Sequence, residues 1–247
     1  MTMELLGFDV GGSSIKAGLV DTSAGHLTSE LLSLPTPQPS TPAAMMQTMA
    51  ALAARLPSKG PVGLAFPTVV KRGVARTAAH VDKSWIGTDG AALIKQALGR
   101  PAVFLNDADA AGIAEMKCGA GRDTPGTVIM LTFGTGIGTA LFVDGILFPN
   151  TELGHLELHG KDSEEWASAR IRTQLNLDWP AWIARVNEYL EALHGLFWPD
   201  VFILGGAVSE RFDEFSKLLR SPAEIRPAHF AGQAGVMGAA LAAAAPR

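Results

Sequence analysis

The sequence predicts an α/β fold in which helices cover mixed β-sheets and in which the chain forms two related domains. Three observations support this prediction. Short apolar segments typical of strands alternate with longer helix-like segments through most of the 247 residues. That length is enough for two small domains or one large domain with a sizeable core. A glycine-centred motif also occurs twice, at 8–21 and 131–144.

Seven segments are expected as strands because they are short, apolar and often β-branched, and because Gly, Pro or Asp bounds most of them. In chain order they lie at 4–10, 15–21, 61–67, 102–107, 128–134, 139–145 and 201–206.

Seven stretches between these strands favour helices. They lie at 41–56, 88–98, 109–118, 163–175, 179–196, 209–219 and 232–244. The proline-rich run LPTPQPSTP (34–42) is expected as a surface connection. The run GAGRDTPG (119–126) is expected as the hinge or inter-domain connection.

The internal repeat indicates a duplicated domain. FDVGGSSIKAGLVD (8–21) aligns without gaps on LTFGTGIGTALFVD (131–144), and each segment has the form strand, glycine turn, strand. The identities are Gly11/Gly134, Ala17/Ala140, Val20/Val143 and Asp21/Asp144. Two related domains would then carry one glycine turn apiece.

Both glycine turns suit the binding of phosphate groups. Glycines at a hairpin tip let a ligand approach the backbone, and successive exposed N–H groups form an anion-binding nest. The Walker A spacing is missing, and no helix follows VGGSSIK as a dinucleotide fingerprint requires. Asp9, at the end of the first strand, is well placed to bind Mg²⁺ directly or through water. Lys16 is a candidate phosphate contact, with an ordinary solvated lysine as the alternative.

The segment FLNDADAAG (104–112) places Asn106, Asp107 and Asp109 after an apolar run. Carboxylates are seldom placed at the end of a buried strand without a function. Asp109 falls where the first turn of a helix is expected, and an acid there stabilises the helix. Helix support is therefore expected of Asp109, but the spacing alone does not decide which of the two aspartates has a chemical role.

A second polar cluster lies in TELGHLELHGKDSEEWAS (151–168), which contains Glu152, His155, Glu157, Glu164 and Glu165. No cysteine lies nearby and no H-E-x-x-H motif occurs, so a structural zinc site is not expected. Carboxylates and an imidazole suit the hydroxyls of a polyol. The alternative is a solvated charged loop.

The composition limits the compartment and the partners. The formal net charge is −4, and Cys118 is the single cysteine, which excludes an intrachain disulfide. No apolar run reaches the roughly 18 residues of a membrane helix, and the first strand leaves no room for a signal peptide. A cytoplasmic protein that binds neither membrane nor nucleic acid is therefore expected.

Together these motifs resemble the ROK family of sugar kinases. The resemblance rests on DVGGSSIKAGLVD, FLNDADAAGIAE, LTFGTGIGTALFVDG, ELGH and ILGGAVSE, which occur in the family's order over almost the whole chain. It implies a duplicated ribonuclease H-like fold of the hexokinase, actin and Hsp70 type, with two domains and a central cleft. We expect residues 1–108, completed by a C-terminal helix at 232–247, to form the small domain, and 109–231 the large one.

One departure narrows the resemblance. Most ROK proteins carry a cysteine-rich zinc motif soon after ELGH, whereas this chain has LELHGKDSEEWAS. Aligning WAS with the end of that motif puts Glu164 at the sugar-contacting position, with Glu165 as the alternative. The zinc-free form is similar to the polyphosphate glucokinase subgroup, which phosphorylates glucose with inorganic polyphosphate and often also with ATP. His80 stands where Asn is expected in that subgroup.

The resemblance implies roles for individual residues. Asp107 would be the general base for the 6-hydroxyl of glucose, and Mg²⁺ would lie near Asp9. Sugar contacts would come from Asn106, Asp107, Glu152, His155 and Glu164. Phosphate contacts would come from Gly11, Gly12, Ser13, Lys16, Gly134, Thr135 and Gly136, and nucleotide contacts from Gly205 and Gly206. A homodimer is also expected. A polyphosphate chain would need a basic groove, for which the candidates are Lys16, Lys71, Arg72, Arg76, Lys83, Lys161, Arg170 and Arg172.

Three alternatives compete with a polyphosphate-using glucokinase. An ATP-only glucokinase, or a kinase for another hexose, would share every catalytic residue. A ROK-type transcriptional regulator would need an N-terminal helix-turn-helix domain, but the first strand is expected at about Glu4. An actin- or Hsp70-like ATPase would not need Asn106-Asp107 or ELGH.

Overall fold

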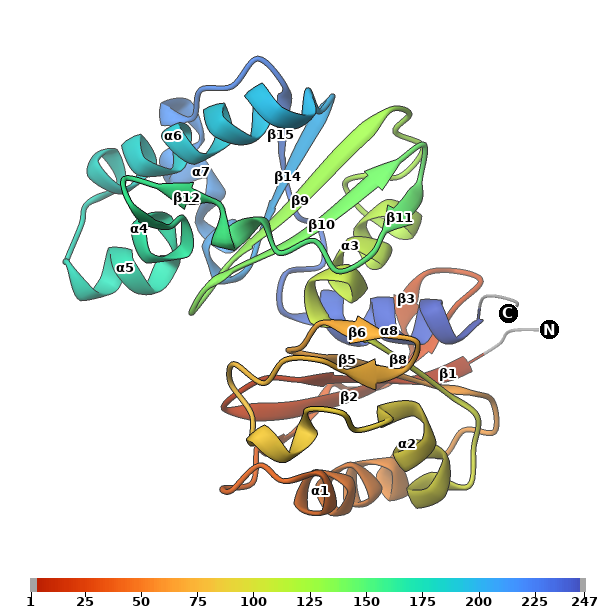
Figure 1. Ribbon diagram of the computed structural model, residues 1–247. Coiled ribbons are helices and arrows are strands. Elements are labelled where there is room, and N and C mark those ends of the chain that lie inside the picture. Colours follow the sequence, from red (N-terminus) through yellow and green to blue (C-terminus); the bar gives the residue numbers. More distant parts are fainter. Residues whose placement is uncertain (1–3, 245–247) are drawn as a thin grey trace. The chain divides into compact units, whose positions relative to one another are not determined.

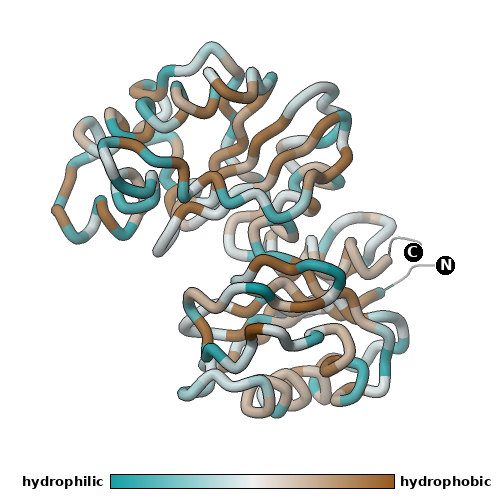
Figure 2. Tube along the Cα trace, in the orientation of Figure 1, coloured by the Kyte–Doolittle hydropathy of each residue, from teal (hydrophilic) through white to brown (hydrophobic). Residues whose placement is uncertain are grey.

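The computed structural model describes residues 4–244. The chain divides into two compact units (Figure 1). Unit 1 comprises Met1–Ala114 together with Gln233–Arg247, and unit 2 comprises Glu115–Gly232. Each unit contains one large mixed β-sheet with its own helices, so the predicted α/β class is confirmed. In Figure 2, hydrophobic residues follow the strands of the sheets and hydrophilic residues gather in the loops.

The sheet of unit 1 has the strand order β3-β2-β1-β5-β8, with β4 pairing with the other end of β2. β1, β5 and β8 run parallel, whereas β2 is antiparallel to β1. The strands are β1 (Glu4–Val10), β2 (Ser14–Asp21), β3 (His26–Leu27), β4 (Leu32–Pro35), β5 (Val62–Phe66) and β8 (Ala102–Asn106), and a separate small hairpin contains β6 (Val70–Lys71) and β7 (Val74–Ala75).

The helices of unit 1 start where the sequence supplies caps. Thr41 and Asp89 accept hydrogen bonds from the backbone of the first turns of α1 and α2, and Gly99 ends α2 in the left-handed conformation. The elements are α1 (Pro42–Arg55), η1 (Lys83–Trp85), α2 (Gly90–Leu98), the start of α3 (Asp107–Cys118) and α8 (Ala234–Ala244).

Helix α8 packs against the sheet of unit 1 at a distance that only glycine permits. A Cβ on Gly7 of β1 would overlap the carbonyl oxygen of Val236, and a Cβ on Gly63 of β5 would overlap that of Ala239. On the helix itself, a Cβ on Gly238 would overlap the carbonyl oxygen of Ala110 in α3. The glycines therefore let α8 lie directly on two strands and beside α3.

The sheet of unit 2 has the order β11-β10-β9-β14-β15. β9, β14 and β15 run parallel, and β10 is antiparallel to β9. The strands are β9 (Thr127–Phe133), β10 (Ile137–Val143), β11 (Ile146–Phe148), β14 (Val201–Gly205) and β15 (Glu224–Pro227), and a small hairpin contains β12 (Glu157–Leu158) and β13 (Lys161–Asp162). β15 escapes a sequence-based assignment because EIRP is short and contains a proline.

Unit 2 has one long helix and several short ones. α6 (Trp179–Phe197) begins at the Asp178 cap and buries Trp182, Tyr189 and other apolar residues against the sheet. The others are η2 (Leu153–His155), α4 (Glu164–Ala167), α5 (Ala169–Gln174), η3 (Ala207–Arg211), α7 (Phe212–Phe215), η4 (Ser216–Leu218) and η5 (Ala231–Gln233).

Two predicted helices are therefore not continuous. Ser168, which has extended backbone angles, divides the stretch 163–175 into α4 and α5. The stretch 209–219 is a series of short 3₁₀ and α turns. A periodic apolar pattern predicts that a segment is helical, but a single residue with extended backbone angles is enough to divide it.

The duplication predicted from the repeated motif is visible in the topology. In each sheet a hairpin supplies the first two strands, a third strand pairs with the second, and two later strands add in parallel to the first. The gapless alignment is wrong beyond the turn, however. Val10 pairs with Ile15, whereas Phe133 pairs with Ile137, so the second turn is one residue shorter.

The predicted domain limits differ from the observed units at two places. The first turns of α3 belong to unit 1 because Ala110 packs with Ala65 and Ala239, so the boundary lies after Ala114 and not at 108/109. The predicted hinge at 119–126 is wrong, since this segment lies within unit 2. Of the predicted helix 232–247, residues 245–247 lie outside the described residues. Within residues 4–244, no helix is both long enough and apolar enough to cross a membrane.

Candidate active site

The candidate catalytic residues lie at the carboxyl edge of the unit 1 sheet. β1, β5 and β8 are parallel neighbours, with Asp9 beside Ala65 and Phe66 beside Asn106. Their carboxyl ends therefore meet at one edge, where α/β proteins commonly bind ligands. Asp9 and Asp107 lie close enough there for the charge of Asp107 to raise the pKa of Asp9.

Asp107 is the first residue of α3 and is half-buried. Burial raises the pKa of its carboxyl group, although the backbone N–H of Ala108, 2.8 Å from Oδ1, and the charge of His80 act in the opposite direction. A carboxyl group with a raised pKa accepts a proton more readily than an ordinary aspartate. The helix start also holds the side chain in one position.

Asn106 and Asp109 form the support of this helix start. The Asn106 Oδ1 accepts the backbone N–H of Asp109 at 3.0 Å, and its Nδ2 donates to the Thr68 carbonyl at 3.1 Å. Asn106 is thus a buried helix cap, and its second amide N–H and the second lone pair of its Oδ1 remain for the predicted sugar contact. Asp109 is only 2% exposed and lies in the first helical turn, as predicted. Both aspartates lie in the first turn of α3, so their position in the helix does not decide which one has the chemical role. Their exposure does, since Asp107 is half-buried and Asp109 is buried.

Asp9 lies in a crowded position next to Lys16 and Gly235. Asp9 and Lys16 are cross-strand partners in the β1–β2 hairpin. Burial and the charge of Asp107 raise the pKa of Asp9 to about 6, and the charge of Lys16 opposes this rise. A Cβ on Gly235 would lie 2.5 Å from the Asp9 Cγ, so only glycine fits at that turn of α8.

The donor set around Asp9 fits Mg²⁺. Two neighbouring carboxylates, one of which raises the pKa of the other, create a site that a divalent cation would stabilise. Among residues 4–244, no three His, Cys, Asp or Glu side chains lie together as a metal cluster. One or two carboxylates are enough to hold Mg²⁺, which completes its coordination with water and substrate phosphates.

The first glycine turn is fixed at its base and exposed at its tip. The Gly11 N–H donates to the Ser14 carbonyl at 2.9 Å. Thr36 bonds the turn twice, through its hydroxyl to the Gly11 carbonyl at 2.6 Å and through its N–H to the Ser13 carbonyl at 3.0 Å. The proline-rich run that carries Thr36 is therefore more than the predicted surface connection. Gly12 and Ser13 are exposed, as a phosphate contact requires.

The second glycine turn, in unit 2, is held by Arg170. The Arg170 N–H donates to the Gly134 carbonyl at 3.0 Å, and its Nε donates to the Thr135 carbonyl at 2.9 Å. Gly134 and Thr135 are exposed. From the sequence, Arg170 is only a candidate for the basic groove, because nothing in the sequence connects it with a turn 35 residues away.

Glu164, and not Glu165, faces the second glycine turn. The Glu164 Oε2 accepts the Ile137 N–H at 3.3 Å, and a Cβ on Gly136 would overlap the same oxygen. Glu165 is exposed on the other side of the short helix α4. The geometry therefore favours Glu164 between the two alternatives.

The ELGH segment brings Glu152 and His155 together with an aspartate that the sequence reasoning missed. The His155 Nδ1 lies 2.7 Å from Asp162 Oδ2, and its Nε2 lies 3.9 Å from Glu152 Oε2. The bond to Asp162 raises the pKa of His155, and the charges of Glu164 and Glu152 act in the same direction. His159 and Gly160, both with positive φ, form the two-residue turn that returns Asp162 to His155. The turn sequence His159-Gly160 is the feature of the sequence from which the pairing of Asp162 with His155 could have been predicted.

The Asp162→Asn substitution tests this pairing. The pKa of His155 is expected to fall toward its ordinary value of about 6.5, because the asparagine cannot hold the protonated imidazole. The stabilisation from this bond is fully present below that value and is lost as the pH rises through the raised pKa of His155. The variant should therefore lose more stability at pH 6 than at pH 8. An NMR titration of the His155 ring proton measures the pKa directly, and an unchanged value would contradict the pairing.

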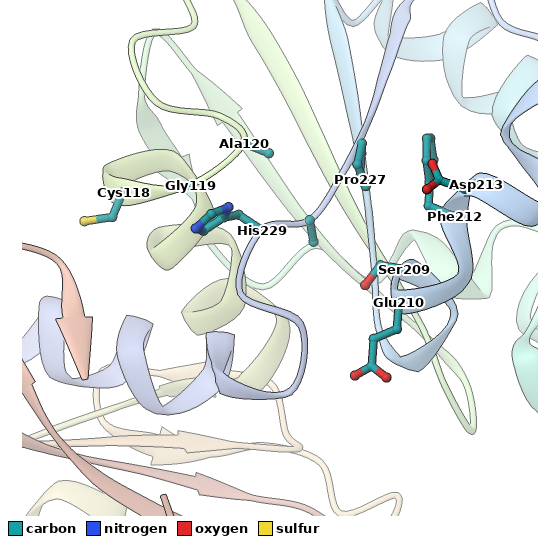
Figure 3. Close-up of a pocket in the computed structure, with 10 residues that line it drawn as sticks. Cys118, Gly119, Ala120, Ser209, Glu210, Phe212, Asp213, Pro227 and His229 are labelled. Atoms are coloured by element: carbon teal, nitrogen blue, oxygen red, sulfur yellow. The ribbon is translucent and has the colours of Figure 1, made fainter. Parts of the chain in front are cut away.

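A cavity of about 560 Å³ lies at the carboxyl ends of β14 and β15 in unit 2 (Figure 3). Its volume falls in the range of small-molecule sites. Its lining comes from three segments: Cys118, Gly119 and Ala120; Ser209, Glu210, Phe212 and Asp213; and Pro227, Ala228 and His229. Gly205 and Gly206 are not among them.

Gly206 shapes this cavity indirectly. It has a positive φ of 84°, and a Cβ there would overlap the carbonyl oxygen of Phe133, next to the second glycine turn. Its own carbonyl accepts hydrogen bonds from the Ser209 N–H and hydroxyl, at 3.0 and 2.8 Å. Gly206 therefore starts the turn that carries Ser209 and Glu210 into the lining.

The remaining basic candidates either stack on aromatic rings or are exposed. Arg172 stacks on Trp179, with 3.7 Å from the guanidinium carbon to the ring centroid, and Lys161 lies 4.9 Å from the centroid of Trp166. Lys71, Arg72, Arg76 and Lys83 are exposed in unit 1. A basic groove stays a prediction.

Comparison with known proteins places the chain in a family. A model of the ROK family matches residues 5–168. The chain belongs to the ROK family. The match includes the first glycine turn, Asp107, the second glycine turn, ELGH and Glu164.

Relatives extend the ROK match over the whole chain. The chain is 47% identical to a polyphosphate glucokinase of Mycobacterium tuberculosis (strain CDC 1551 / Oshkosh) over 97% of its own length and 91% of that protein's. It is 43% identical to the polyphosphate glucokinase of Mycobacterium leprae over 97% of its length and 74% of that protein's. The crystal structure of the inorganic polyphosphate/ATP-glucomannokinase from Arthrobacter sp. strain KM superposes with a TM-score of 0.93, at 44% identity and 98% coverage of both chains. The predicted duplicated ribonuclease H-like, two-domain kinase fold is confirmed.

Proposed function

We propose that this protein phosphorylates glucose at the 6-hydroxyl, with inorganic polyphosphate as donor and ATP as a second donor. The observation that carries the reaction class is the Asp9–Asp107 pair beside an exposed glycine turn at the carboxyl edge of the unit 1 sheet. Similarity to two polyphosphate glucokinases over 97% of this chain supports the choice of polyphosphate.

Asp107 acts as the general base. Phosphoryl transfer needs an oriented hydroxyl, an in-line donor and neutralised charge more than covalent chemistry. The Asp107 carboxylate accepts the proton of the 6-hydroxyl as the hydroxyl oxygen attacks the terminal phosphorus atom of the donor. The bond from that phosphorus to the bridging oxygen breaks, and ADP or a polyphosphate shortened by one phosphate leaves. The raised pKa of Asp107 favours this proton transfer. Asn106 fixes the helix start that carries Asp107.

The two glycine turns bind the donor phosphates. Backbone N–H groups of the two turns, which are exposed at Gly12 and Ser13 and at Gly134 and Thr135, present partial positive charge to phosphate oxygens. Lys16 adds a full positive charge at the first turn. Asp9 would hold Mg²⁺, which when bound neutralises charge on the donor phosphates.

The sugar is held by Glu152, His155 and Glu164. The bond from Asp162 to the His155 Nδ1 leaves the Nε2 for a sugar hydroxyl. Glu152 and Glu164 lie close enough to affect the pKa of His155, so the three side chains can act on neighbouring hydroxyls of one ring.

The cavity beyond Gly206 accommodates the adenosine of ATP. It adjoins the second glycine turn through the contact of Gly206 with Phe133, so a nucleotide there would direct its phosphates toward that turn. Polyphosphate lacks a base and a ribose, and would need the turns but not the cavity.

A comparison of donors tests the proposal. Purified protein with Mg²⁺ is expected to form glucose 6-phosphate with polyphosphate and also with ATP, measured by a coupled dehydrogenase assay. Removal of Mg²⁺ with a chelator should abolish both reactions. Turnover with ATP alone would leave an ATP-dependent glucokinase, and turnover with neither would overturn the proposal. Mannose belongs in the same assay because the Arthrobacter relative is a glucomannokinase. A cytoplasmic location and a homodimer remain part of the proposal.

A further inference from the structure

Glu115 is a fully buried carboxylate that none of the roles above uses. It lies near the end of α3, and its exposed fraction is 0%. Burying a carboxylate is unfavourable unless both oxygens find hydrogen-bond donors. The hydrogen-bond partners of Glu115 therefore indicate its role.

Both carboxylate oxygens bind backbone N–H groups from distant segments. The Oε2 accepts the Ala120 N–H at 2.8 Å, and the Oε1 accepts the Phe230 N–H at 2.9 Å. Gly119 is packed against the same group, since a Cβ there would overlap Oε2. One side chain thus connects two segments that are 110 residues apart in the sequence, Ala120 and Phe230.

These two segments form adjoining parts of the cavity lining. Gly119 and Ala120 belong to one, and Pro227, Ala228 and His229 lead directly into Phe230 (Figure 3). Arg226 adds a second connection, because its Nη1 donates to the Ala120 carbonyl at 2.9 Å. Ala120 is therefore held on both its N–H and its C=O side.

We propose that Glu115 is a positioning residue that fixes one wall of the cavity for adenosine, and thereby supports the use of ATP but not of polyphosphate. This rests on the proposed function, in which the cavity takes the nucleoside part of ATP. The side-chain hydrogen bonds of Glu115 reach Ala120 and Phe230, and neither residue belongs to a glycine turn or to the sugar-binding group. Loss of these bonds should therefore act on one donor only.

The Glu115→Gln substitution tests the proposal with both donors. An amide keeps the size of the side chain but has one oxygen, so one of the two backbone N–H groups loses its acceptor. The KM for ATP is expected to rise about tenfold, in line with the loss of a hydrogen bond to a charged group. The KM and kcat with polyphosphate should stay within about twofold of the wild type, because no hydrogen bond of the glycine turns or of the sugar-binding residues is lost. Polyphosphate turnover by the same sample also reports that the variant is folded.

Asp200→Asn is the matched control. Its carboxylate also accepts a backbone N–H in unit 2, that of Thr127 at 2.7 Å, but at the start of β9 and far along the strand from the cavity. This variant should leave the ratio of the two KM values unchanged. Gly119→Ala should displace the Glu115 carboxylate and reproduce the selective rise in the KM for ATP.

The outcomes distinguish a wrong role for Glu115 from a wrong assignment of the nucleotide site. Equal changes with both donors in E115Q and G119A, or no change with either, would overturn the role of Glu115 while the kinase proposal stands. A wild-type protein that neither uses ATP nor binds it in calorimetry would overturn the nucleotide part of the proposed function, and the inference with it.

Discussion

Replacing Asp107 with asparagine is expected to lower turnover by about 10²–10⁴-fold, the usual contribution of a general base. The asparagine oxygen can still accept the Ala108 N–H, so the start of α3 should keep its geometry. Glucose binding should therefore survive, because the asparagine keeps the shape of the site while losing the ability to take up a proton. Steady-state kinetics and calorimetric titration of glucose measure the two effects separately.

Asp109→Asn is the control that separates the two aspartates. Asp109 is buried in the first turn of the same helix, so its substitution should affect stability more than chemistry. Near-normal turnover in D107N, or a larger loss of turnover in D109N, would reverse the assignment.

The Gly238→Ala substitution is expected to destabilise the protein by about 2 kcal/mol or more. Alanine favours a helix over glycine by about 1 kcal/mol, but here the added Cβ would overlap the carbonyl oxygen of Ala110. That oxygen belongs to the backbone of α3 and cannot move alone, and overpacking of this kind usually costs about 1–3 kcal/mol and sometimes more. The steric term therefore outweighs the helix propensity. The midpoint of urea unfolding measures the loss.

Gly195→Ala provides the same substitution without the clash. Gly195 lies in α6, and a Cβ there would meet no atom within 4 Å. This variant should be as stable as the wild type or slightly more stable, by about 0.5–1 kcal/mol. Equal effects of G238A and G195A would show that α8 does not depend on the close approach at Gly238.

The parts of the fold that depend on local pattern could be predicted from the sequence. The seven strands were expected near their observed positions because each is a short apolar segment. The glycine turns and the Asn106-Asp107 strand end were expected for the same local reason. The duplicated topology followed from the repeat of the hairpin motif, even though the alignment beyond the turn was displaced by one residue.

The parts that depend on distant partners could not be predicted. Thr36 bonds the first glycine turn and Arg170 the second, and neither contact leaves a periodic signal in the sequence. Asp162 and Glu115 were missed because a carboxylate in a charged or helical segment looks the same whether it faces water or holds a histidine or a loop. Ser168 divided a predicted helix through its own backbone angles.

The one-residue difference between the glycine turns has a consequence for how the duplicated halves diverged. In the first hairpin the cross-strand pair at the strand end is Asp9 with Lys16, whereas the corresponding pair in the second is Thr132 with Gly138. The ancestral symmetry has thus been lost in chemistry while it persists in topology. The first hairpin has an acidic and a basic side chain at this pair. The second has uncharged residues at the corresponding pair, and its turn is bound by the guanidinium of Arg170. A graft of the first hairpin into the second position would carry one residue too many and would turn every following side chain to the opposite face of the sheet.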